Sequence, residues 1–172
     1  MSTTDAFTSL FERMPDLVHS AVEDLSTDDL SRPPAPGANT VAWLVWHLSR
    51  VEDDHVAKAA SALGRDSVEQ VWMRGGFADR FGLPLPPEDT GFGHSPEQVG
   101  QVRAGGELLE IYYRAVHEQT QKFLGHLDDK AWGTVVDRHW DPPVTLLARM
   151  TSVANEVAQH VGQAAYVRGL LS

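Results

Sequence analysis

Apolar residues recur at helical spacing in four long stretches of the chain, covering residues 3–25, 39–61, 95–127 and 145–170. Pro15 should kink or divide the first helix. Asn39 or Thr40 caps the second. The third begins with the capping sequence Ser95-Pro96-Glu97-Gln98 and is softened near Gly105-Gly106. We find no convincing strands, so the pattern predicts an all-α fold in which four helices form a bundle.

The connection between the second and third helices, residues 62–94, is long, rich in glycine and proline, and contains several aromatic residues. A connection of this length in a compact domain is usually functional or carries short helices of its own. Its aromatic content argues against disorder. We expect residues 1–172 to form a single domain with this irregular excursion between helices two and three.

Composition narrows the classes of function. The chain of 172 residues has a net charge of −10, which argues against binding to nucleic acid. It has no cysteine, so any metal must be held by His, Asp or Glu, and any reacting thiol must come from outside. No apolar run reaches the roughly 18 residues of a membrane span, and the N-terminus does not resemble a secretory signal. We therefore expect a cytoplasmic protein that acts on a small molecule.

The candidate chemistry lies on two helices. Glu156 and His160 are four residues apart, so both side chains leave the same face of the fourth helix. His47 is a histidine in the otherwise apolar start of the second helix. Together these three residues would make a metal site with room for a substrate. Packed histidines that hydrogen-bond to neighbours, with a solvated glutamate, explain the same residues equally well.

Further polar residues flank these three. Asp54, Gln159 and Gln163 are candidates for contacts that orient the ligands or bind substrate, and Arg168 could bind an anionic group. Simpler explanations are a solvated charge for Asp54, an interhelical hydrogen bond for Gln163 and a helix-dipole contact for Arg168. His55 is expected at the surface or at the mouth of the site. The tryptophans are expected mostly in the core or a dimer interface, although they could line a pocket; they are Trp43, Trp46, Trp72, Trp132 and Trp140.

The ordered motifs of the chain resemble the DinB/YfiT-like superfamily, and most closely its DUF664 branch, which is related to mycothiol-dependent maleylpyruvate isomerase. The segments that carry the resemblance are Pro36-Gly37-Ala38-Asn39, Trp46-His47-Leu48, Arg138-x-Trp140-Asp141-Pro142-Pro143-Val144-Thr145, Glu156-x-x-x-His160-x-Gly162-Gln163 and Ala165-Tyr166-Val167-Arg168-Gly169. The resemblance implies an up-down-down-up four-helix bundle, often a homodimer. It also implies a divalent metal held by His47, Glu156 and His160.

Glu156 stands where many members of this family have a histidine, whereas the mycothiol-dependent isomerases are similar to this chain in using two histidines and one glutamate for zinc. The resemblance therefore implies a metal-dependent thiol transferase, in which zinc, or else nickel or iron, activates a low-molecular-weight thiol such as mycothiol. The isomerases carry a further C-terminal domain that contributes to catalysis and that we do not expect here, so isomerase activity itself is not expected. Alternatives are a non-heme iron oxygenase, a metal-dependent hydrolase and a non-catalytic dimeric bundle that binds a metal or small molecule.

Overall fold

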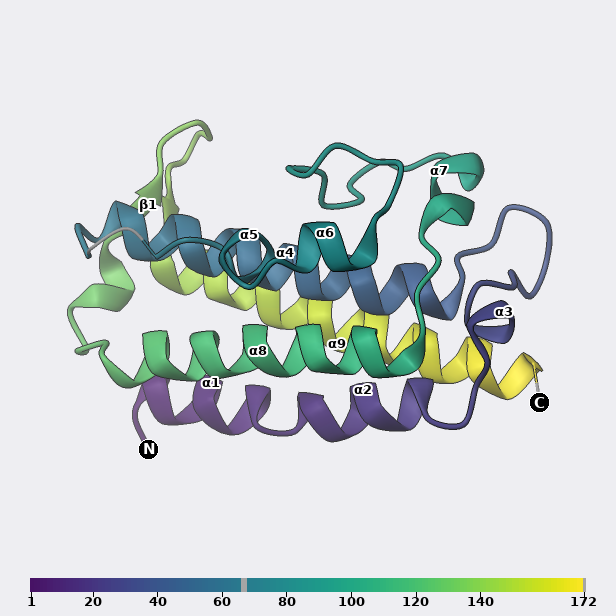
Figure 1. The fold of residues 1–172 in the computed structure, drawn as a ribbon. Coiled ribbons are helices and arrows are strands. Elements are labelled where there is room, and N and C mark those ends of the chain that lie inside the picture. The colour runs from purple at the N-terminus through teal and green to yellow at the C-terminus, as the bar shows by residue number, and fades with distance from the viewer. Residues whose placement is uncertain (66–67, 172) are drawn as a thin grey trace.

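The computed structural model describes residues 1–65 and 68–171, and it is mainly helical (Figure 1). The helices of four or more residues are α1 (Thr3–Phe11), α2 (Met14–Val22), α3 (Thr27–Leu30), α4 (Val41–Ala62), α5 (Val71–Arg74), α6 (Phe77–Phe81), α7 (Pro96–Gln101), α8 (Gly106–Gly125) and α9 (Leu146–Leu171). A 3-10 turn spans Ala131–Gly133, and two short strands, β1 (Val135–Asp137) and β2 (Val144–Thr145), precede α9. The all-α class predicted from the apolar spacing is confirmed.

Four long helical segments pack side by side. The consecutive helices α1 and α2 form one segment, and α4, α8 and α9 form the other three. Helix α4 packs against α8 and α9, and α2 packs against the same two helices. In Figure 1 the chain runs in one direction through α1, α2 and α9, and in the opposite direction through α4 and α8. This arrangement places the two helices with candidate ligands, α4 and α9, next to each other.

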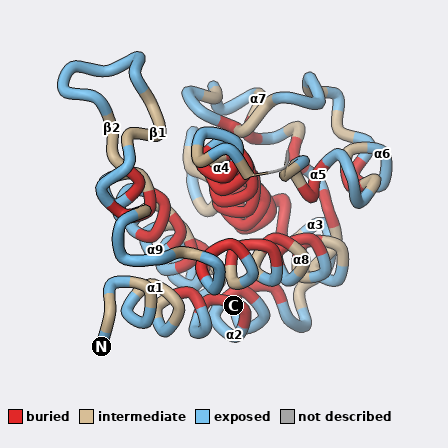
Figure 2. The backbone as a smooth tube through the Cα atoms, turned by 90° about the vertical axis from the view of Figure 1, so that its left-hand side faces the viewer, coloured by how far each residue is buried: buried red, intermediate tan, exposed pale blue. Residues whose placement is uncertain are grey.

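Helix α4 lies at the centre of the molecule, and its residues are buried on nearly every side (Figure 2). It begins where Thr40 Oγ1 accepts a hydrogen bond from the backbone N–H of Trp43, which satisfies one of the free N–H groups of the first turn. A central helix must bury whatever polar side chains it carries, so each needs a partner. No described helix is long and apolar enough to cross a membrane.

Proline and capping residues set several boundaries as expected. Pro15 falls in the first turn of α2 and separates it from α1. Ser95 and Gln98 form the expected capping box at the start of α7. The expectation of one continuous third helix was wrong, because Val102 has extended backbone and separates α7 from α8. Val102 and Ala104 are buried there, so the break places apolar side chains in the core.

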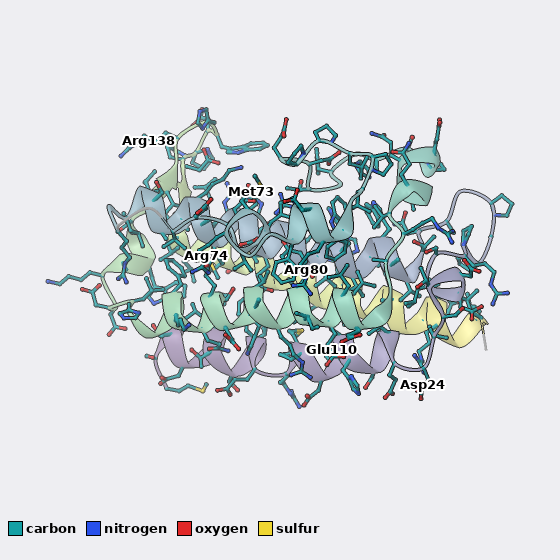
Figure 3. The ribbon with its side chains drawn as sticks, in the orientation of Figure 1. Asp24, Met73, Arg74, Arg80, Glu110 and Arg138 are labelled. Carbon is teal, nitrogen blue, oxygen red and sulfur yellow. The ribbon has the colours of Figure 1, made fainter. Side chains whose placement is uncertain are left out.

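The excursion between α4 and α7 carries two short helices, α5 and α6, as its length suggested. It is fixed to the bundle by polar contacts: Arg74, labelled in Figure 3, donates to Gln119 Oε1 on α8 (2.9 Å). The absence of strands was predicted wrongly. Strands β1 and β2 pair antiparallel in a hairpin, and Arg138 marks its projecting end in Figure 3. Three and two residues are too few to show alternation in a sequence.

Candidate metal centre

Three potential metal ligands from two helices meet at the α4–α9 contact. Glu156 and His160 lie one turn apart on α9, and His47 faces them from α4. Glu156 Oε1 is 3.3 Å from His47 Nε2 and 3.0 Å from His160 Nε2. One ligand atom from each of the three residues lies within 4.8 Å of the other two. The structure thus brings together the three residues predicted as ligands, which we call the triad.

The outer nitrogen of each imidazole ring has its own partner. His47 Nδ1 is bonded to the backbone carbonyl oxygen of Thr90, and His160 Nδ1 is bonded to Gln163 Oε1 (2.8 Å). The Thr90 carbonyl can only accept, so Nδ1 of His47 carries the proton and donates it. With the Gln163 amide oxygen facing the ring, Nδ1 of His160 donates as well. In the neutral ring the proton is then absent from Nε2, which presents a lone pair. This is the arrangement in which histidine binds a metal through Nε2.

The inner atoms of the triad therefore include no donor when both rings are neutral. Two unprotonated Nε2 atoms and a carboxylate oxygen point at one another, and each is an acceptor. An extra proton on a ring would supply a donor, but burial lowers the pKa of His47 and makes its charged form costly. His47 is 4% exposed. A divalent cation would satisfy all three atoms at once, so the residues fit a metal.

A tight turn and an indole ring hold His47 in place. The ring of Trp43 stacks on His47 with centroids 4.5 Å apart and an interplanar angle of 14°. On the side of Nδ1, Gly91 lies so close that an added Cβ would be 2.8 Å from Nδ1 of His47 and 2.9 Å from Trp46. Gly91 also has a φ of 89°, which favours glycine. The chain can therefore bring Thr90 to His47 because residue 91 has no side chain.

The turn is fixed in its shape by Asp89. Its carboxylate accepts from the backbone N–H of Gly91 (2.8 Å) and pairs with His94 Nε2 (2.9 Å). His94 Nδ1 in turn accepts from the indole N–H of Trp43 (3.1 Å). The Asp89 side chain thus closes the turn and, through His94, links it to the Trp43 ring that stacks on His47. Hydrogen-bonded partners of this kind fix the orientation of a metal-binding histidine.

A cavity of about 490 Å³ adjoins the triad, and His47 and Glu156 line it. The remaining lining residues come from α4, from the excursion, from the hairpin end and from α9; they are Val51, Asp54, His55, Lys58, Glu88, Thr90, Phe92, Trp140, Arg149 and Ser152. A metal held by the triad would have an open side toward this space. Three protein ligands and an open position are typical of catalytic sites.

The other predicted site residues fall in different places. Gln163 contacts the triad directly through His160. Asp54 lines the cavity, but its carboxylate is bonded to Lys58 (2.7 Å) and Gln70 (2.9 Å). Gln159 is exposed on α9. Arg168 donates to the backbone carbonyl oxygen of Glu23 at the end of α2, so it joins two helices there.

His55 lies at the cavity wall, as expected for a residue at the mouth of the site, and its ring is 3.8 Å from Asp54. Four of the five tryptophans are buried, and Trp140 is the exposed one. Sequence reasoning missed the turn that orients His47, formed by residues 89–94. Its signal was a pair of glycines that flank an aromatic residue and are followed by His94, within an excursion already expected to be functional.

The fold and the site together describe a helical bundle that carries a two-histidine, one-glutamate cluster beside a cavity. Comparison with known families agrees: the sequence profile of the DinB superfamily matches residues 10–164, and the chain belongs to this superfamily. A crystal structure of a conserved protein from Enterococcus faecalis is similar, with a TM-score of 0.87 and 27% identity. That similarity covers 99% of this chain and 98% of the other. A search of curated proteins found no match.

Proposed function

We propose that this protein is a metal-dependent thiol transferase, in which His47, Glu156 and His160 hold a divalent metal, with zinc as the first candidate. The observation that supports metal binding is the arrangement of hydrogen-bond acceptors in the triad. Three lone pairs converge, and the outer nitrogen of each ring is already used to donate to an oxygen. A mixed set of imidazole and carboxylate ligands suits zinc, nickel and iron.

The choice of thiol chemistry follows from the resemblance of the two-histidine, one-glutamate set to the mycothiol-dependent isomerases. A bound divalent metal would deprotonate an external thiol, which supplies a nucleophile near neutral pH. Formation of the new sulfur–carbon bond accompanies departure of the leaving group with its bonding electrons, and the thiol proton goes to solvent. The thiol must come from outside because the chain has no cysteine. A cytoplasmic homodimer remains our prediction for the acting form.

The residues of the chain position the reactants. Trp43 and Thr90 hold the His47 ring in one orientation, and Gln163 does the same for His160. The cavity would give a small electrophile access to the side of the triad where His47 and Glu156 line its wall. Val51 contributes an apolar part of the wall. Fixed ligands beside a pocket bring two reactants together, and such positioning accounts for much of the rate in transfer reactions.

The first test is the metal content of protein purified without an affinity tag. We expect about one zinc per chain by elemental analysis, and loss of that zinc in His47→Ala, Glu156→Ala and His160→Ala. His55→Ala is the matched control, because His55 lines the same cavity from the same helix as His47 but stands outside the triad. Wild-type protein that stays empty after incubation with zinc, nickel or iron would contradict the metal site.

The second test is activity. Zinc-loaded protein should consume an electrophile such as 1-chloro-2,4-dinitrobenzene only when a thiol is added, and the three triad variants should lose this activity while His55→Ala retains it. Mycothiol and cysteine can be compared as thiols. A protein that holds metal but transfers no thiol would leave the non-catalytic metal-binding bundle as the function. Consumption of an ester without any thiol would instead indicate a hydrolase.

A further inference from the structure

Two strongly exposed aromatic side chains line the cavity that adjoins the triad. Phe92 is 92% exposed and Trp140 is 66% exposed, and both line this cavity although 48 positions separate them in the chain. Aromatic side chains are usually buried, and an apolar side chain left in water at a pocket is typical of a surface that binds something. Every other phenylalanine and tryptophan of the chain is buried in the core or, in the case of Phe7, packed against it. Phe92 and Trp140 are therefore not part of the core.

Both residues lie on turns that are firmly held. Phe92 lies between Gly91 and Gly93 in the turn that Asp89 closes, so its backbone is fixed while its ring projects outward. Trp140 lies at the end of the β1–β2 hairpin. That hairpin is tied to α9 by Arg149, which donates to Asp137 (2.6 Å). In Figure 1 the hairpin and the end of the excursion rise above α4 on either side of the space between them.

We propose that Phe92 and Trp140 are specificity-determining residues that bind the flat, apolar part of an uncharged electrophile at the mouth of the metal cavity. We call this pair the aromatic lip. Turns that are held in advance lose little backbone entropy when a ligand covers the rings that they carry. Aromatic pairs are most favourable when offset or edge-to-face, which suits a planar ligand that enters between the two rings. This inference names the substrate class of the proposed transferase and rests on that function.

The charges inside the cavity favour an uncharged ligand over an anion. The two cations of the wall are already paired: Arg149 with Asp137 at 2.6 Å, and Lys58 with Asp54 at 2.7 Å. Glu88 adds a further acidic group to the lining. Apart from the metal that the triad would hold, an anion finds only cations that are already paired in this wall, whereas a neutral apolar molecule needs no partner from them. The volume of about 490 Å³ suits a molecule of one or two rings.

The test uses binding, so that it does not depend on turnover. Zinc-loaded protein is titrated with N-phenyl-1-naphthylamine, an uncharged fluorescent probe, and with its sulfonated relative 8-anilinonaphthalene-1-sulfonate. We expect the uncharged probe to bind more tightly, and its Kd to rise about tenfold in Phe92→Ala and in Trp140→Ala. Trp140→Phe, which keeps a ring, should restore most of the affinity. Tyr166→Ala is the matched control: it removes a ring that is 70% exposed on α9 and does not line the cavity.

Kinetic measurements distinguish the role of the aromatic lip from the thiol transferase activity itself. The lip variants should raise KM for 1-chloro-2,4-dinitrobenzene, which has a ring, by more than they raise KM for iodoacetamide, a small electrophile without a ring. Equal probe affinity in the wild type and both lip variants would overturn the lip. So would dissociation of a dimer in Trp140→Ala, seen by analytical ultracentrifugation, because the rings would then belong to an interface. Probe binding that depends on the lip, without any thiol transfer, would support the lip and contradict the transferase.

Discussion

Helix α4 carries two polar clusters that are satisfied in opposite ways. The first is the triad, where His47 meets two residues of α9 and the inner atoms are acceptors. The second, which we call the Arg50 network, joins Arg50 and Asp53 to the excursion and to α8, and every bond in it pairs a donor with an acceptor. Each cluster includes buried polar residues of this one helix, His47 in the triad and Arg50 with Asp53 in the network. Burial alone therefore does not identify a functional group.

The polar groups of the Arg50 network satisfy one another without a ligand. The Arg50 guanidinium, which is fully buried, donates to the Asp89 carbonyl (3.1 Å) and to Gln70 Oε1 (2.9 Å). The Asp53 carboxylate accepts from two backbone N–H groups and from the Tyr112 hydroxyl (3.0 Å). Such a network fixes the excursion against the bundle. The triad has no such internal balance, and this imbalance is what indicates a cation-binding site.

The largest effect should come from changing the Asp53 carboxylate to an amide. In Asp53→Asn an amide N–H₂ would face donors that now meet an oxygen, and Arg50 would lose its nearby charge. Breaking one partner of a buried network costs about 3–5 kcal/mol. We expect that loss in the free energy of unfolding, measured by urea denaturation. A loss below about 1 kcal/mol would show that the network is dispensable to the fold.

A third buried acid of α4, Glu52, should make stability depend on pH. Its carboxylate accepts from Thr120 Oγ1 (2.6 Å), and burial raises its pKa from 4.5 to about 7. Below pH 4.5 the group is protonated in both states, so its contribution to stability is complete. As the pH rises to about 7 the unfolded chain ionises first, and the free energy of unfolding falls by roughly 3 kcal/mol.

Glu52→Gln isolates this contribution, because the amide keeps the shape and cannot ionise. The free energy of unfolding of each protein is measured from pH 4 to 8, and the difference between them at each pH is compared. Between pH 4.5 and about 7 the free energy of unfolding of the wild type should fall relative to that of Glu52→Gln. Above pH 7 the difference between the two proteins should become constant. Parallel curves for the two proteins would show that Glu52 is already ionised in the folded protein at low pH.

The matched substitution in the triad should behave unlike Asp53→Asn. In metal-free Glu156→Gln, the amide N–H₂ can donate to an Nε2, so we expect an unfolding free energy equal to the wild type or higher by about 0.5–1 kcal/mol. Zinc at one hundred times its Kd should stabilise the wild type by about 2.7 kcal/mol and the variant hardly at all. Urea denaturation with zinc and with a chelator measures both. Destabilisation of the metal-free variant by several kcal/mol would place the triad with the structural networks.

The parts of this comparison that depend on short spacing could be predicted from the sequence. Glu156 and His160 share a face because they are four apart, and His47 stood out as a histidine in an apolar helix. The Arg50 network was not predicted, because its partners in the excursion and on α8 lie up to 62 positions away and meet only in the folded bundle. The same holds for Thr90, which is 43 positions from His47. The break at Val102 was missed because its apolar neighbours fit a helical pattern equally well.

The smallest effect tests how the turn positions the triad. In Gly91→Ala the new Cβ would lie 2.8 Å from His47 Nδ1, so the turn must move and Thr90 must shift from the ring. We expect zinc affinity to fall about tenfold, which is the lower end for groups that orient a metal-binding histidine. Competition with a chelator of known affinity measures the change. The free energy of unfolding should fall by about 1–3 kcal/mol because the backbone conformation disfavours alanine.

Gly93→Ala is the control that separates strain from contact. Gly93 has a φ of 74°, similar to the 89° of Gly91, but an added Cβ would meet nothing within 4 Å. Both variants should therefore lose a similar part of their stability to backbone strain, while only Gly91→Ala should lose zinc affinity. If the two variants lose affinity equally, the turn acts on the triad through its overall rigidity. If neither loses affinity, the Thr90 carbonyl does not orient His47 for metal binding.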